Sequence, residues 1–346
     1  MKSYWKASIV TEHTCLERAV AKCNRNLTSA FVANEMYSLI LDNLHYEPKQ
    51  IIVQIERIYN YTISYAKAWR AKQKVFEMRF GTYKDSYDNL PHVKQFPNAE
   101  EGRSIVQRVF FCFGPCVRVF QYCRPILCID GTFLTGQYNG TILTAIGIDG
   151  NNQVLPVAFA FVEGENTDSW YWFLERVKNQ LVSSRSDVCL ISDRHSGILH
   201  AIDKLKYGNG ASPPLWPDVH SRWCMRHLAA NFHDHFKNKE LTDMFKRLYE
   251  LTAKQATESS SSASIRTSKP FSQWIQDKPK EKWALLYDTN GKHYRIMTTN
   301  IAESYNMVMR GSRGLPLVGT VEFIMYGCAK YFRERYIDIS ADLTNP

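Results

Sequence analysis

The chain has 346 residues, 45% of them hydrophobic and 13% aromatic, which is enough for one large core or for two to three domains. This composition excludes a disordered or fibrous protein. Its uncharged apolar stretches fall far short of the roughly 18 residues that a membrane-spanning helix needs, so we expect no membrane partner. The opening sequence MKSYWKASIV lacks the apolar segment and cleavage site of a secretory signal.

Nine cysteines without the spacing of a disulfide framework indicate a reducing compartment, nuclear or cytoplasmic. The formal net charge of +9 predicts a polyanionic partner. Much of this charge lies in residues 49–84, which contain eight basic residues and two acidic ones. A solvated helical face is the alternative explanation for this segment, because such faces are common on soluble helices.

Three short helices are predicted in the first part of the chain. Apolar residues recur at helical spacing in 28–44, Pro48 favours the start of a second helix, and Ser64 is a suitable cap for a third. The second helix is expected to reach about Tyr59 and the third to close near Gly81. Three helices with basic residues on the last resemble a helix-turn-helix module, and a helical linker is the alternative. The candidates for phosphate contacts are Lys67, Arg70, Lys72, Lys74 and Arg79.

From about residue 105 the sequence changes to short runs rich in β-branched and aromatic residues. The turn sequence DGNNQ separates two of these runs and predicts neighbouring strands. A helix that Thr167 could cap and another from Ser196 to Lys206 lie between later runs, so we predict an α/β sheet. The expected strands are 109–113, 126–130, 141–148, 154–162, 188–193 and 219–224. Helices follow, interrupted by ESSSSASIR, which is typical of an exposed loop.

Two acids are expected at the ends of predicted strands. Asp130 closes the run PILCID, and Asp193 closes VCLISD. Ligands of open α/β sheets gather at the carboxyl ends of strands, so adjacent placement of these two strands would bring the carboxylates together. A divalent metal would relieve their repulsion. The alternative for either residue alone is a turn or a helix cap.

A third carboxylate would complete a two-metal site of the kind that acts on phosphodiesters. Capping explains the acids at the strand-to-helix junction, and Glu175 lies on a helix face that we expect to be exposed. Glu303, within MTTNIAESYN, is expected in the first turn of a helix. The candidates are Glu163, Glu165, Asp168, Glu175 and Glu303.

Several ordered motifs carry a resemblance to a known family. The segments CIDGTFLTGQYNGTILTAIGIDG, LISDRHSGI, WPDVHSRWCMRHLAANF and MTTNIAESYN resemble the plant-type transposases of Mutator-like elements, and the similarity extends over about residues 26–336. The resemblance implies an RNase H-like mixed sheet with flanking helices and a catalytic triad of Asp130, Asp193 and Glu303. It also implies two Mg²⁺ or Mn²⁺ ions, a nuclear location, and a homo-oligomer on DNA that recognises terminal inverted repeats and target DNA.

The resemblance also divides the chain into regions. Residues 1–25 would be the remnant of a zinc-finger module, 26–95 a helical DNA-binding region, and 96–225 the RNase H-like core. Residues 226–298 would be a helical insertion, and 299–346 would hold the terminal catalytic helix and a final helix.

Some cysteines depart from the zinc sites of the family. His13 and Cys15 could close a zinc finger, but no cysteine precedes them, so zinc is not expected there. Cys224 and His227 match a Cys-x-x-His pattern of the family, for which we expect a role near the active site rather than zinc ligation. Cys112 and Cys116 lie in an apolar aromatic run and are expected to be packed.

The leading functional hypothesis is a DNA transposase that cleaves and transfers strands at element ends. The alternative from another class is a domesticated, transposase-derived transcriptional regulator that binds DNA without catalysis. A ribonuclease acting on RNA–DNA hybrids is a third hypothesis, since it would share the fold and the metals.

Overall fold

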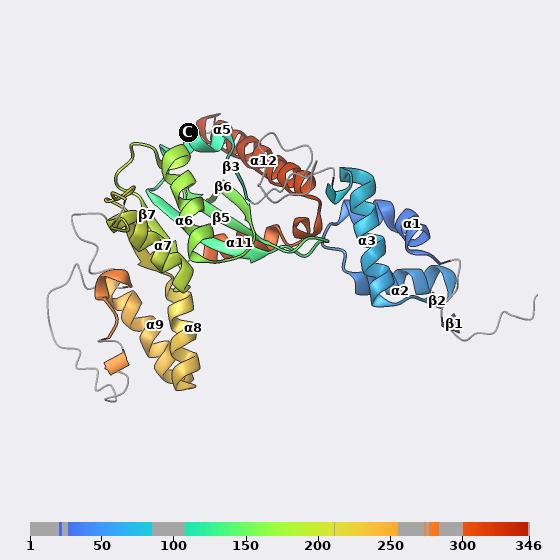
Figure 1. The fold of residues 1–346 in the computed structure, drawn as a ribbon, viewed down its shortest axis with the longest axis horizontal. Coiled ribbons are helices and arrows are strands. Elements are labelled where there is room, and N and C mark those ends of the chain that lie inside the picture. The colour runs from blue at the N-terminus through green and yellow to red at the C-terminus, as the bar shows by residue number, and fades with distance from the viewer. Residues whose placement is uncertain are drawn as a thin grey trace, which may run out of the picture. The chain divides into compact units, whose positions relative to one another are not determined.

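The computed structural model describes residues 21–22, 27–84, 108–210, 212–254, 273–274, 277–283 and 300–344 (Figure 1). Contacts divide the chain into two compact units, Met1–Gly81 and Thr82–Pro346. The predicted zinc-finger remnant at His13 and Cys15 and the serine-rich segment 258–266 lie outside the described residues.

The first unit contains the three predicted helices, α1 (Ser29–Asp42), α2 (Pro48–Tyr59) and α3 (Tyr65–Phe80). Each start has a local cause. Thr28 Oγ1 accepts a hydrogen bond from the backbone N–H of Phe31, Pro48 occupies the first turn of α2, and Ser64 Oγ accepts from the N–H of Lys67. The expected bounds of all three helices are therefore confirmed to within two residues.

The core of this unit forms where α3 packs against both α1 and α2. The buried side chains of α3 recur at helical spacing and form the face that packs against the other two helices; they are Ala68, Ala71, Gln73, Val75 and Phe76. Two short strands, β1 (Ala21–Lys22) and β2 (Tyr61–Thr62), pair in parallel beside the helices. Fully buried residues of this core are Val32, Met36, Ile40, Ile51, Ile55, Ala68, Val75 and Phe76.

The second unit is built on a six-stranded mixed sheet with the order β3-β6-β5-β4-β7-β8. The pairs β3–β6, β6–β5 and β5–β4 are antiparallel. The pairs β4–β7 and β7–β8 are parallel. The strands are β3 (Val109–Phe111), β4 (Ile126–Phe133), β5 (Thr141–Ile148), β6 (Val154–Val162), β7 (Cys189–Ser192) and β8 (His220–Trp223).

Helices cover both faces of this sheet, as expected for an α/β protein (Figure 1). The helices of the whole unit are α5 (Gly114–Phe120), α6 (Thr167–Arg176), α7 (Ser196–Tyr207), α8 (Met225–Phe236), α9 (Lys239–Lys254), α11 (Asn300–Val308) and α12 (Leu317–Thr344). A π-helical turn, Val177–Val182, continues α6, and short 3₁₀ turns lie at Lys280–Lys282 and Ser312–Gly314. The arrangement is compatible with an RNase H-like fold.

Alternation along β4 assigns its side chains to the two faces. Leu127 and Ile129 pack in the large core with α5, α6 and α7, whereas Ile126 and Cys128 pack with α11. The next residue on the α11 face is Asp130. Strand geometry therefore directs this carboxylate to the layer formed by α11.

Several boundary predictions need correction. Asp130 does not end its strand, because Gly131, Thr132 and Phe133 continue β4 by pairing with β5. Asn166, not Thr167, caps α6, and its Oδ1 accepts from the N–H of Ser169 at 2.9 Å. Helix α5 was not predicted, and β3 is two residues shorter than expected.

Two further expectations concern packing and membranes. Cys116 is fully buried in the large core and Cys112 packs against it, as predicted from their aromatic surroundings. Among the helices that the structure describes, none has the length and apolarity needed to cross a membrane.

Candidate active site

Asp130 and Asp193 lie at equivalent positions of two parallel neighbours, β4 and β7. The last registered pair joins Cys128 to Ile191, and two residues further along each chain lead to the two acids. Asp193 follows β7 directly, and its Oδ1 accepts a hydrogen bond at 3.0 Å from the backbone N–H of His195, the residue that precedes α7. The predicted adjacency of the two strands is confirmed.

The environment of Asp130 disfavours its charged form. Burial is the main cause that raises the pKa of this carboxyl to about 6, and the charges of Asp193 and Glu165 raise it further. The backbone N–H of Gly131 and the nearby His227 act in the opposite direction. A carboxylate held beside two others in a partly buried place is the arrangement that a cation would stabilise.

Helix α11 supplies a direct partner for Asp130. Asn306 Nδ2 donates a hydrogen bond to Asp130 Oδ2 at 2.7 Å, and the asparagine side chain is 9% exposed. Glu303 precedes Asn306 by three residues, so both side chains lie on one face of the helix. Glu303 is in the first turn of α11, as predicted.

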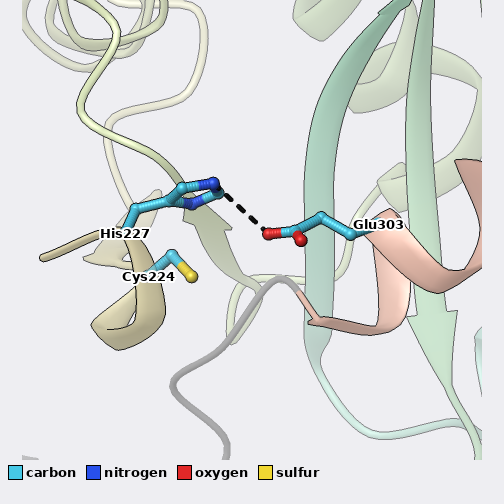
Figure 2. A group of neighbouring side chains, drawn as sticks. All are labelled: Cys224, His227 and Glu303. Carbon is cyan, nitrogen blue, oxygen red and sulfur yellow. Dashed lines mark ion pairs between the residues drawn. The ribbon is translucent and has the colours of Figure 1, made fainter. Parts of the chain in front are cut away.

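Glu303 also contacts the start of α8. It forms an ion pair with Arg226, and its Oε1 lies 3.3 Å from His227 Nε2. Cys224 is close to both residues, since one ligand atom of each of Cys224, His227 and Glu303 lies within 4.8 Å of the others. Figure 2 shows the cysteine and histidine at the beginning of α8 directed toward the glutamate on α11.

Backbone contacts connect this cluster to the strand that precedes Asp193. The N–H of Cys224 donates to the carbonyl of Ser192 at 2.7 Å, which anchors the start of α8 to the end of β7. The pKa of His227 is raised, chiefly by a hydrogen bond with Cys224 and further by Asp193 and Asp130, although burial lowers it. Cys224 and His227 therefore lie beside Glu303, and the charges of Asp193 and Asp130 act on His227, while their expected role near the active site stays a prediction.

Two cavities open at this edge of the sheet. One has a volume of about 410 Å³, and its lining includes Asp130, Glu303, Asn306 and Arg226. The other has a volume of about 600 Å³, and its lining includes Asp193 and His227. Acidic, basic and imidazole groups thus border space that is large enough for a ligand.

Glu165 is the acid whose position the sequence did not reveal. A Cβ placed on Gly131 would lie 2.3 Å from Glu165 Oε1, so the carboxylate rests against the backbone next to Asp130. Burial raises the pKa of Glu165 most, and Asp193 raises it further, while His195 lowers it. The sequence signal was its place after a predicted strand, but capping explained it equally well until Asn166 proved to be the cap.

The other candidates for the third acid have different surroundings. Glu163 pairs with Arg108, whose Nε donates to Oε2 at 2.9 Å, and this contact is the main cause that lowers the glutamate pKa to about 2. Asp168 lies in the first turn of α6, where its backbone carbonyl accepts from Arg108 at 3.0 Å. Glu175 lies near the end of the same helix.

The basic residues of α3 belong to the first unit and are not equivalent. Arg70 and Lys74 are exposed one turn apart, and Lys67 is on the same face. Lys72 instead donates its Nζ hydrogen to the Leu44 carbonyl at 2.9 Å, and Nζ lies 5.4 Å from the centre of the Phe76 ring. Arg79 is exposed near the end of the helix and lies 5.1 Å from the Phe80 ring centre.

Residues 126–231 match the family model described as the MULE transposase domain. The chain carries a MULE transposase domain. The matched segment of the transposase domain begins with β4, includes Asp130, Asp193, Cys224 and His227, and ends within α8. Among curated proteins, no match was found.

The transposase domain gives the chain a transposase-type function and DNA as its partner. Glu303 and α11 lie beyond the matched segment, so their assignment depends on the structure and on the similarity of MTTNIAESYN to the family. Asn306 was not identified from the sequence, although its spacing from Glu303 is the signal that would have revealed it.

Proposed function

We propose that this protein is a Mutator-like DNA transposase of the plant type that performs metal-dependent strand cleavage and strand transfer at element ends. One observation carries the proposal: within a transposase domain, Asp130 lies on β4 and Asp193 directly follows its parallel neighbour β7. Helix α11 adds the amide of Asn306 and the carboxylate of Glu303, which line the same cavity as Asp130.

The donor set is suited to hard divalent cations. Carboxylate oxygens are the ligands that Mg²⁺ and Mn²⁺ prefer, and the pKa of Asp130 is raised mainly by burial and further by the charges of Asp193 and Glu165, so a nearby cation would stabilise its charged form. We assign Asp130, Asp193 and Glu303 as the residues that would hold Mg²⁺ or Mn²⁺ in a two-metal site. Such ions polarise a phosphodiester and activate an attacking water or 3′ hydroxyl.

The chain's own groups determine how the carboxylates are presented. Asn306 fixes one oxygen of Asp130, and the backbone N–H of His195 fixes one oxygen of Asp193. Both hydrogen bonds restrict rotation of the acids before a substrate arrives. Glu303 starts from an ion pair with Arg226 and must exchange that partner to join the other two acids.

The first unit is the proposed DNA-binding region. The exposed bases Arg70 and Lys74 and the half-buried Lys67 lie on one face of α3, from which they can reach phosphates. Lys72 is engaged by Leu44 and Phe76, so we assign it the smallest share of phosphate binding among the five predicted residues. The proposal includes a homo-oligomer on DNA that binds terminal inverted repeats and a nuclear location.

Nicking of supercoiled plasmid in Mg²⁺ or Mn²⁺ tests the proposed activity. Asp193→Asn should abolish nicking while DNA binding stays nearly intact, and Asp203→Asn is the matched control because Asp203 is an exposed carboxylate on α7. Metal-dependent nicking that survives Asp193→Asn would contradict the assignment. DNA binding without nicking in the unmodified protein would favour the non-catalytic regulator.

A further inference from the structure

The cluster of Cys224, His227 and Glu303 contains three different metal-binding groups. Cys224 caps α8, His227 follows within its first turn, and Glu303 approaches from α11 (Figure 2). Their ligand atoms lie within 4.8 Å of one another. The two helices that supply them are separated in the sequence by the helical segment after α8, so this convergence is produced by the tertiary fold.

The chemistry of this donor set differs from that of the acids on the sheet. A thiolate, an imidazole and a carboxylate suit Zn²⁺, whereas Mg²⁺ and Mn²⁺ favour oxygen ligands. Nitrogen and oxygen ligands at zinc distances of about 2.1 Å lie about 3.4 Å apart in a tetrahedral site. The separation of 3.3 Å between His227 Nε2 and Glu303 Oε1 agrees with that spacing.

We propose that Cys224, His227 and Glu303 form a zinc site that competes with the catalytic metals for Glu303. The competition rests on the proposed function, because it assigns the same glutamate to the site of Asp130 and Asp193. Zinc would hold the carboxylate at α8 and thereby weaken binding of Mg²⁺ or Mn²⁺ at the sheet. Three protein ligands leave a fourth tetrahedral position for water.

The surroundings allow this change with small movements. Arg226 has to release Glu303, and its side chain is 53% exposed and can turn into solvent. Cys224 is fully buried, and its backbone bond to Ser192 holds the thiol in place. Binding converts the Cys224 thiol into a thiolate ligand and releases its proton to water.

Cobalt absorption tests the site without any catalytic readout. Co²⁺ replaces Zn²⁺ in such sites, and a thiolate ligand gives it a charge-transfer band in the near ultraviolet. The metal-stripped protein should gain this band, Cys224→Ser should lose it, and Zn²⁺ should displace it. Cys123→Ser is the control, because Cys123 is buried in the large core away from α8. A band that persists in Cys224→Ser, or that never forms in the unmodified chain, overturns the zinc site.

His227→Gln provides a second test of the site in case Cys224→Ser does not fold. It should weaken Co²⁺ binding at least tenfold while the far-ultraviolet circular dichroism stays native. Asp130→Asn should keep the thiolate band, since Asp130 is not among the three ligands. Loss of the band in folded Asp130→Asn protein would contradict a site that is separate from the acids on the sheet.

The competition is measured as the affinity of the protein for Mn²⁺. The electron paramagnetic resonance signal of the free ion gives this affinity. One equivalent of Zn²⁺ should weaken Mn²⁺ binding several-fold in the unmodified protein and leave it unchanged in Cys224→Ser. Equal weakening in both proteins, or none in either, overturns the competition. Absence of Asp130-dependent Mn²⁺ binding would overturn the competition together with the proposed function, whereas the cobalt band would still decide the zinc site.

Discussion

The acids on the sheet and the acid on α11 are held in different ways. Asp130 is held by the pairing of β4 with β5, and Asp193 directly follows β7, the parallel neighbour of β4. Glu303 is held through side-chain contacts with Arg226 and His227. The site therefore combines two carboxylates fixed by strand pairing with one whose partners can change.

Asp130 and Glu303 also differ in the energetic cost of their charges. Asp130 lies beside other acids and has a raised pKa, so its charge is costly in the absence of a cation. Glu303 lies beside a guanidinium and an imidazole, which compensate its charge. A cation would relieve the cost of the buried Asp130 charge, whereas Glu303 must leave favourable partners to take part.

The largest expected effect is on cleavage. Glu303→Gln should lower the rate of metal-dependent nicking by on the order of 10³-fold, because metal ligation supports several kcal/mol of transition-state stabilisation. The matched control is Glu334→Gln, since the Glu334 side chain is 55% exposed and pairs with the surface residue Lys330. Full activity of Glu303→Gln would remove the helix acid from the site.

The second effect is on stability and depends on pH. Asp130 has a folded-state pKa of about 6, above the unfolded value near 3.9, so the folded protein loses stability as pH rises through this interval. Asp130→Asn should remove this loss and raise the free energy of unfolding at pH 8 by up to about 3 kcal/mol without divalent metal.

Chemical denaturation of both proteins at pH 8 and pH 4 measures this difference. The gain should be much smaller at pH 4, where the carboxyl of the folded state is protonated and that of the unfolded state is close to its pKa of about 3.9. Added Mg²⁺ should stabilise the unmodified protein and leave Asp130→Asn unaffected. An equal stability of the two proteins at pH 8 would show that the charge of Asp130 costs the folded protein no stability.

The third effect concerns the residue that connects the two regions. Asn306→Ala should lower cleavage by roughly 30-fold, because a hydrogen bond to a charged group contributes about 2 kcal/mol and here it orients Asp130. Asn306→Asp should lower activity more, since a second charge would lie beside the carboxylate. A kcat loss with little change in DNA affinity is the expected signature, and a loss of DNA affinity alone would contradict a positioning role.

The smallest effect tests Glu165. Gly131→Ala places a methyl group where the Glu165 carboxylate lies, so this flexible side chain must move. We expect a loss of activity of about threefold to tenfold, and no further loss when the change is made in a Glu165→Ala background. Additive losses in the double variant would show that Gly131 acts through the backbone and not through Glu165.

The sequence was sufficient where local signals decide the structure. Caps at Thr28 and Ser64 and the proline at 48 place the helices of the first unit, and the turn at 149–153 places β5 beside β6. The parallel placement of the strands with Asp130 and Asp193 followed from the general behaviour of α/β sheets.

The sequence was insufficient where contacts between residues far apart in the chain determine the structure. Gly131 and Thr132 have the composition of a turn, but pairing with Leu143 and Ile142 of β5 extends the strand past Asp130. The contact between Glu303 and His227 joins helices that are far apart in the chain, and no local pattern encodes it. The spacing of Asn306 from Glu303 places it on the same helix face, but its hydrogen bond with Asp130 depends on how α11 packs on the sheet.

The most direct measurement is the anomalous diffraction of crystals grown with Mn²⁺. The account predicts manganese between Asp130 and Asp193, with Glu303 turned from Arg226 toward the ion and Asn306 still bonded to Asp130. Manganese that leaves Glu303 paired with Arg226, or that binds away from both aspartates, would contradict the claim that these three acids form one metal site.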